Sequence, residues 1–179
     1  FLCNATELKA NEKILLILFT LWYLLSIQFI SQYMIMNQGS VIYEKNIFKT
    51  KEIMFVFLNF VIMIFSIVFL FFQAFIYRFI ILLFKPQKYP SIFSSFFYLM
   101  IGYLPFSITI IITNFIHQEY VYNISTNIYA KIFITIIVNV IYIFIIVKKN
   151  IIDSKKALLL CMFLIVINAL VLFINFNSL

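Results

Sequence analysis

Five long apolar runs, separated by four short polar segments, dominate this sequence and limit what the chain can fold into. Each run reaches or exceeds the roughly 20 residues that a helix needs to cross the ~30 Å hydrocarbon core of a membrane. The runs are continuous rather than alternating, which favours helices over the strands of a membrane barrel. They lie at about 14–36, 53–84, 92–116, 128–147 and 157–176.

The composition leaves little sequence for anything else. Hydrophobic residues make up 65% of the 179 residues, and only 11% are charged. We therefore expect a single all-α membrane domain over 1–179, formed by a bundle of five transmembrane helices. The first run is longer than the apolar part of a signal peptide and does not end in a small-residue cleavage site, so we expect it to be a retained span.

The basic residues predict an orientation for this bundle. The N-terminus, the links 85–91 and 148–156, and Arg78 at the adjoining helix end carry nine basic residues, against four on the opposite side. The positive-inside rule therefore places the N-terminus in the cytoplasm and, with an odd number of spans, the C-terminus outside. Because the abundance of Ile, Phe, Asn and Lys resembles that of AT-rich bacterial genomes, we expect the bacterial cytoplasmic membrane.

Two polar links then lie on the outer side, 37–52 and 117–130. In the first, the segment from Asn37 to Ser40 predicts a turn. The rest of that link mixes apolar and charged residues, which fits either a short amphipathic helix on the membrane surface or an irregular loop.

The third run has the most distinctive local signals. Ser91 precedes it as a candidate N-cap. Gly102 permits close helix packing, and Pro105 removes one backbone hydrogen bond, so we expect a kink and a central position in the bundle. Thr109 and Thr113 follow on the face of Pro105, where their hydroxyls are available to freed backbone groups or to a neighbouring helix.

Four of the runs each contain an asparagine. Buried amides form hydrogen bonds between membrane helices, so we interpret these residues as inter-helix polar contacts, with a polar substrate site as the alternative. The residues are Asn59, Asn114, Asn139 and Asn168.

The sequence lacks the residues that several kinds of chemistry require. The lone His117 lies at an interface and the lone Asp153 in a loop, no acidic or basic residue lies deep within a span, and there is no phosphate-binding loop. Cys3 and Cys161 have no metal-ligand spacing, and we expect both to be unpaired. The net charge of +7 is spread over the span ends, unlike a nucleic-acid patch. We therefore expect no enzyme activity, no cofactor, no metal and no nucleic-acid partner.

The segment Lys-Pro-Gln-Lys-Tyr-Pro-Ser at 85–91, followed by Ser94–Ser107 with Gly-Tyr-Leu-Pro at 102–105, resembles the Yip family of five-span membrane proteins, in particular its bacterial branch. The resemblance covers about 53–147. It implies a basic cytoplasmic link after the second span and an accessory, non-enzymatic role beside ABC-type peptide exporters or in envelope stress. The long acidic N-terminal region of eukaryotic members is absent, so the resemblance does not support a Rab-binding role.

The function expected from these observations is that of a membrane adaptor or accessory subunit, for example of an ABC-type peptide exporter or an envelope complex. Its expected partners are membrane lipids and another integral membrane protein or a second copy. The candidate contact residues are Arg78, Lys85 and Lys88, held near the membrane by Tyr77 and Tyr89, with plain attraction to lipid headgroups as an equal alternative. The alternative functions are a small-solute-binding subunit of a transporter and a bacteriocin-immunity protein.

Overall fold

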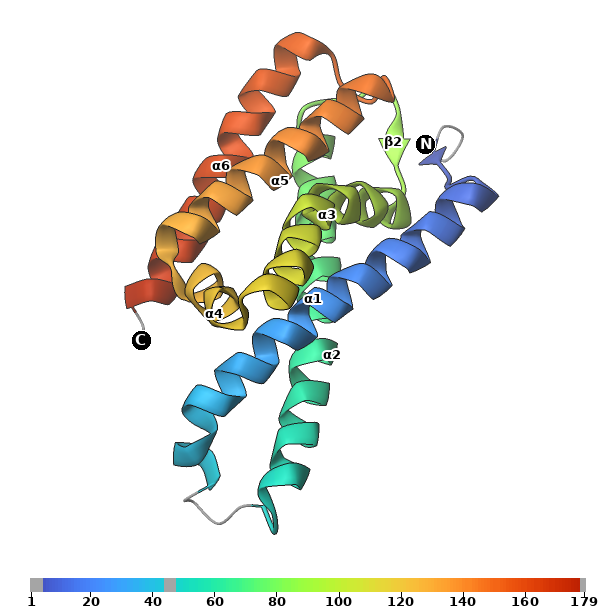
Figure 1. The fold of residues 1–179 in the computed structure, drawn as a ribbon. Coiled ribbons are helices and arrows are strands. Elements are labelled where there is room, and N and C mark those ends of the chain that lie inside the picture. Colours follow the sequence, from blue (N-terminus) through green and yellow to red (C-terminus); the bar gives the residue numbers. More distant parts are fainter. Residues whose placement is uncertain (1–4, 44–47, 178–179) are drawn as a thin grey trace.

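The computed structural model describes residues 5–43 and 48–177, with side chains described over 7–36 and 48–170. Over these residues the chain forms six helices and two very short strands (Figure 1). In chain order they are β1 (Ala5–Thr6), α1 (Ala10–Tyr43), α2 (Lys51–Leu83), β2 (Tyr89–Pro90), α3 (Ile92–Ile116), α4 (Gln118–Thr126), α5 (Ile128–Lys148) and α6 (Ser154–Asn177).

Four helices are long and apolar enough to cross a membrane, namely α1 as far as Met36, α2, α3 and α5. This arrangement indicates a multi-pass helical membrane protein, because only internally hydrogen-bonded helices of this length satisfy their backbone in lipid. The fifth apolar run forms α6, a helix of 24 residues.

The side chains that begin the helices explain where several of them start. Ser91 accepts a hydrogen bond from the backbone N–H of Ser94 at 3.1 Å, so the predicted N-cap of α3 is confirmed. Thr50 caps α2 in the same way, accepting from Ile53 at 3.3 Å. Hydroxyls at these positions satisfy backbone donors that have no partner within the helix.

The links 37–52 and 117–130 differ from the sequence-based prediction. The turn predicted from Asn37 to Ser40 is wrong, because α1 continues through it to Tyr43. Asn, Gly and Ser each cost a helix at most about 1 kcal/mol, and no proline interrupts the hydrogen bonding there. Of the surface helix considered for 41–52, residues 44–47 lie outside the described residues. The link 117–130 contains the helix α4, which was not predicted from the sequence.

Helix α3 occupies the centre of the bundle, where it contacts α1, α2, α4 and α5 (Figure 1). Half of its most apolar stretch is buried, compared with 17% in α1 and α2 and 28% in α5. The expected central position of the third run is therefore confirmed. The core beside it is formed by side chains that are almost fully buried, including Leu70, Ile81, Leu99, Tyr142 and Leu160.

The first two helices extend well beyond this core. At ~1.5 Å per residue, the 34 residues of α1 and the 33 of α2 measure about 50 Å each. The half of α2 nearest Lys51 exposes a row of large apolar side chains, among them Val56, Phe60 and Phe65. Such a surface suits contact with lipid or with another membrane helix.

Candidate functional site

The most polar region inside the bundle is centred on the hydroxyl of Tyr77 in α2. It donates a hydrogen bond to Oδ1 of Asn139 in α5 at 2.5 Å and accepts one from Nδ2 of Asn168 in α6 at 2.6 Å. Gln73, one turn earlier in α2, also directs its Nε2 at this hydroxyl, at 3.2 Å. Three helices are thereby joined through one buried oxygen atom.

Gln73 extends the network towards the central helix. Its Oε1 accepts a hydrogen bond from the hydroxyl of Tyr103 in α3 at 3.1 Å. The ring of Tyr103 in turn packs edge-on against Tyr23 of α1, with ring centroids 5.6 Å apart. We call Gln73, Tyr77, Tyr103, Asn139 and Asn168 the polar cluster. It links α2, α3, α5 and α6 directly and reaches α1 through the tyrosine pair.

Three buried polar atoms have no hydrogen-bond partner among the described residues: Nδ2 of Asn139, which belongs to the polar cluster, Oγ of Ser95 and the hydroxyl of Tyr142. Ser95 and Tyr142 face each other, but their hydroxyls do not meet hydrogen-bond geometry. The cluster consists of amides and phenols, which stay neutral near pH 7. It is therefore suited to cross-linking helices rather than to transferring protons.

Of the four asparagines predicted as inter-helix contacts, Asn139 and Asn168 both lie in the polar cluster and bond Tyr77 of another helix. Asn59 also contacts another helix, because its Oδ1 accepts a hydrogen bond from Ser31 of α1. Asn114 does not, since within the described part of the chain it forms no hydrogen bond to another helix. It lies in the last turn of α3, beyond the most deeply packed part of that helix.

Gly102 marks a close approach of α3 to α5. A Cβ atom added there would lie 3.0 Å from the backbone oxygen of Val138 and 3.1 Å from its Cγ1, so only glycine fits without a shift. Gly102, Pro105 and Thr109 line one cavity of about 190 Å³ between these helices. Thr113 lines a neighbouring cavity of about 430 Å³.

The region around Pro105 agrees only in part with prediction. The helix α3 continues through the proline and changes direction along its length (Figure 1). The hydroxyl of Thr109 donates to the backbone oxygen of Pro105 at 2.9 Å. It therefore bonds neither the carbonyl of Ile101, which the proline frees, nor a neighbouring helix.

The three predicted contact residues near the link 85–91 have different environments. Arg78 is half-buried, and its Nε donates to the backbone oxygen of Pro90 at 2.9 Å, so it fastens the link to α2. Lys85 and Lys88 are exposed. Tyr77 was expected to anchor this region at the membrane surface, and that expectation is wrong, because Tyr77 is buried in the polar cluster. Tyr89 is exposed, as that role requires.

Lys85 also has a backbone role, since its φ of 51° lies in the left-handed region. A residue in this conformation directly after the C-cap is a common end to a helix, and Pro86 then prevents continuation. Asn150 adopts the same conformation, with φ 53°, after the C-cap of α5.

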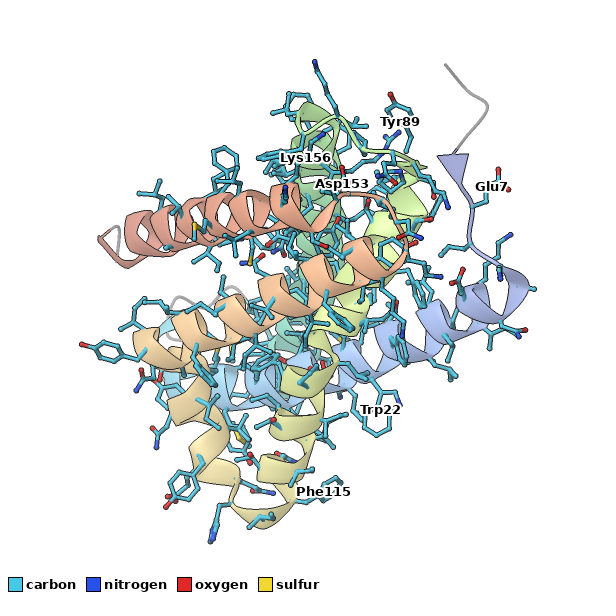
Figure 2. The ribbon with its side chains drawn as sticks, turned by 90° about the horizontal axis from the view of Figure 1, so that it is seen from above. Glu7, Trp22, Tyr89, Phe115, Asp153 and Lys156 are labelled. Atoms are coloured by element: carbon cyan, nitrogen blue, oxygen red, sulfur yellow. The ribbon has the colours of Figure 1, made fainter. Side chains whose placement is uncertain are left out.

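Segments far apart in the sequence meet at this end of the bundle. The strand β1 pairs in parallel with β2, and the backbone N–H of Gln87 donates to the oxygen of Ile151 at 2.8 Å. The side chain of Gln87 also bonds Asp153. Tyr89, Asp153 and Lys156 lie at this end, away from Phe115 (Figure 2). We call the joined segments 5–9, 84–91 and 149–156 the link platform.

Two further contacts hold the link platform to the helices. Glu12 near the start of α1 forms an ion pair with Lys149, at 2.7 Å between Oε1 and Nζ. The hydrogen bond that Lys149 donates to this carboxylate is the main cause that raises the pKa of the Lys149 ammonium. Lys156 donates from its Nζ to the backbone oxygen of Phe84 at 3.3 Å.

Gln73, Tyr77 and Tyr103 were not predicted from the sequence as members of the polar cluster. Gln73 carried a usable signal, since an amide inside an apolar run requires a partner just as asparagine does. No group of His, Cys, Asp and Glu side chains able to hold a metal ion occurs among the described residues. Comparisons with protein-family models, curated proteins and solved structures found no match to this chain.

Proposed function

We propose that the chain is a five-span membrane adaptor whose N-terminus lies in the cytoplasm and which binds another integral membrane protein. In this proposal α6 is the fifth span and the link platform faces the cytoplasm. The resemblance of 85–91 and 102–105 to the Yip family suggests an ABC-type peptide exporter as the class of partner. The main support for the adaptor proposal is the construction of the link platform.

The observation that carries the proposal is that three separate segments form one fixed surface. Backbone hydrogen bonds join β1 to β2 and Gln87 to Ile151, and Arg78 fastens Pro90. Attraction to anionic lipid needs only basic residues near the membrane and no fixed spacing. A surface with defined geometry instead favours recognition of a particular partner, since less freedom is lost on binding.

Exposed lysines give the link platform its charge. Lys85, Lys88 and Lys155 are exposed and form no ion pair with another described residue. An acidic segment on the partner is therefore the matching chemistry. Because Arg78 holds the link in place, we assign it a positioning role and assign the docking role to Lys85 and Lys88.

Affinity purification in mild detergent tests this assignment. The double variant Lys85→Gln/Lys88→Gln should lose most of the co-purified partner while keeping the melting temperature of the wild type. The matched control is Lys49→Gln/Lys131→Gln, which removes the same charge at the opposite end and should retain the partner. Equal recovery of the partner by both variants would contradict the docking role.

A second candidate function is binding of a small solute. The cavity of about 430 Å³ beside α4 has polar side chains on its wall, including His117, Asn123 and Asn127. It shares Ile124 and Ala130 with the apolar cavity next to Gly102. If a purified monomer binds a polar solute saturably and Asn123→Ala abolishes that binding, this function replaces the adaptor.

A further inference from the structure

Two cavities lie along α1 and share part of their lining. The first, of about 440 Å³, lies at the end of the bundle that carries the link platform. The second, of about 500 Å³, continues from it between α1, α2 and α3. Leu16 and Phe93 line both cavities, so we treat them as one feature and call it the α1–α3 groove.

The two parts of the groove differ sharply in polarity. The first is lined by Glu7, Lys13 and Ser91 together with apolar residues. The second is lined by apolar side chains such as Ile17, Leu21, Val68 and Phe71, with one exception, Thr20. The hydroxyl of Thr20 donates to the backbone oxygen of Leu16 at 2.7 Å, so it offers the groove no free donor.

This arrangement matches the shape of one membrane lipid. From Lys13 to Leu21 the wall formed by α1 extends about 12 Å along the helix axis. One leaflet contributes about half of the ~30 Å hydrocarbon core. A headgroup at Lys13 would therefore leave an acyl chain alongside Ile17 and Leu21, within its own leaflet. Both of these side chains are exposed, at 61% and 57%.

The charges at the mouth of the groove distinguish between headgroups. Glu7 projects from the segment between β1 and α1 (Figure 2). Glu7 and Lys13 have opposite charges, and neither forms an ion pair with another residue in the described part of the chain. Lys13 suits a phosphate, whereas Glu7 suits an ammonium group and repels an acidic headgroup.

We propose that the α1–α3 groove binds one glycerophospholipid with a primary-amine headgroup, of the phosphatidylethanolamine class. The lipid phosphate contacts Lys13, its ammonium group contacts Glu7, and one acyl chain lies along the apolar wall. The site is separate from Lys85 and Lys88, so its test does not depend on the adaptor function.

Native mass spectrometry of the purified protein can count the retained lipid. The protein is mixed with micelles that contain either phosphatidylethanolamine or phosphatidylglycerol of the same acyl composition. The wild type should retain one phosphatidylethanolamine in preference to phosphatidylglycerol. Lys13→Gln should weaken retention of either lipid about fivefold, the factor that one basic residue contributes near a lipid surface. Glu7→Gln should lower the preference for phosphatidylethanolamine by a similar factor.

Two further variants separate the groove from general charge effects. Lys9→Gln removes a charge four residues before Lys13 but does not line the groove, so it should retain lipid like the wild type. Leu21→Trp fills the apolar part and should abolish retention, with Ile17→Trp as a substitute if the first variant does not fold. The proposal is overturned if the wild type shows no preference for phosphatidylethanolamine, or if Glu7→Gln leaves that preference unchanged. It is also overturned if the groove is closed by a second copy that excludes lipid.

Discussion

Tyr77 and Asn139, 62 residues apart in the sequence, are joined by a 2.5 Å hydrogen bond inside the bundle. Among the described residues the phenol has three hydrogen-bond partners, whereas the amide of Asn139 has only this one. Nδ2 of Asn139 is buried and has no partner among them. Asn139 therefore depends on Tyr77 for its whole side-chain hydrogen bonding within the described part of the chain.

Replacing Tyr77 with phenylalanine should consequently destabilise the bundle. The ring is kept, but Oδ1 of Asn139 loses its partner, whereas Nδ2 of Asn168 still donates to the backbone oxygen of Leu164. A buried group left without its hydrogen bond costs about 1–3 kcal/mol, and the range for membrane helices lies towards the lower end. Thermal or denaturant unfolding in detergent would measure the loss of stability.

Tyr142→Phe is the matched control for that experiment. The two tyrosine rings pack edge-on with centroids 5.0 Å apart, and both are almost fully buried. The hydroxyl of Tyr142 has no hydrogen-bond partner among the described residues, so its removal should be neutral or slightly stabilising. If both variants lose the same stability, the hydrogen bonds of Tyr77 are not the cause.

Gly102→Ala should loosen the contact between α3 and α5. The added methyl group would lie 3.0 Å from the backbone oxygen of Val138, and backbone cannot rotate away as a side chain can. Overpacking of this kind costs about 1–3 kcal/mol. The double variant Gly102→Ala/Val138→Ala should recover part of the loss, because it removes the Cγ1 contact but leaves the carbonyl contact. Full recovery would show that the backbones do not limit the approach.

Much of this fold could be predicted from local patterns in the sequence. The run at 92–116 matches α3, and Ser91 caps it as its position suggested. The links 85–91 and 148–156, grouped by their basic residues, do meet at one end of the bundle. These features follow from hydropathy, capping and charge, which act over a few residues at a time.

The polar cluster could not be predicted in this way. Tyr77 lies beside Arg78 near the end of a long run, where a tyrosine usually marks the membrane interface. Its burial results from how α2 rotates against α5 and α6, and hydropathy does not specify that rotation. For the same reason Asn114, which has the same residue type as Asn139, has no inter-helix partner in the described part of the chain.

The hydrogen bond between Ser31 and Asn59 should couple α1 to α2 measurably. A double-mutant cycle with Ser31→Ala and Asn59→Ala isolates this pair, and similar pairs in membranes contribute on average about 0.6 kcal/mol and at most about 1.7. Ser66 is a useful control, because among the described residues its hydroxyl bonds only the backbone oxygen of Met63 in its own helix. A cycle with zero coupling would mean that the two long helices are held by apolar contact alone.

The proposed orientation predicts which positions react with a membrane-impermeant thiol reagent in intact cells. In a background without Cys3 and Cys161, cysteines at Asn123 and Thr126 should react, whereas those at Lys88 and Ser154 should react only after permeabilisation.

The structure adds a requirement that the count of basic residues does not contain. Gln87 contacts both Ile151 and Asp153, so Lys88 and Ser154 must lie on the same side. Reaction at both of these positions, without reaction at Asn123, would show that the orientation is the reverse of the proposed one, while the arrangement of the helices stays as described. Reaction at only one of the two would contradict the five-span arrangement itself. A tag after Leu179 tests whether α6 is the fifth span, because the tag should be accessible from outside only if α6 crosses the membrane.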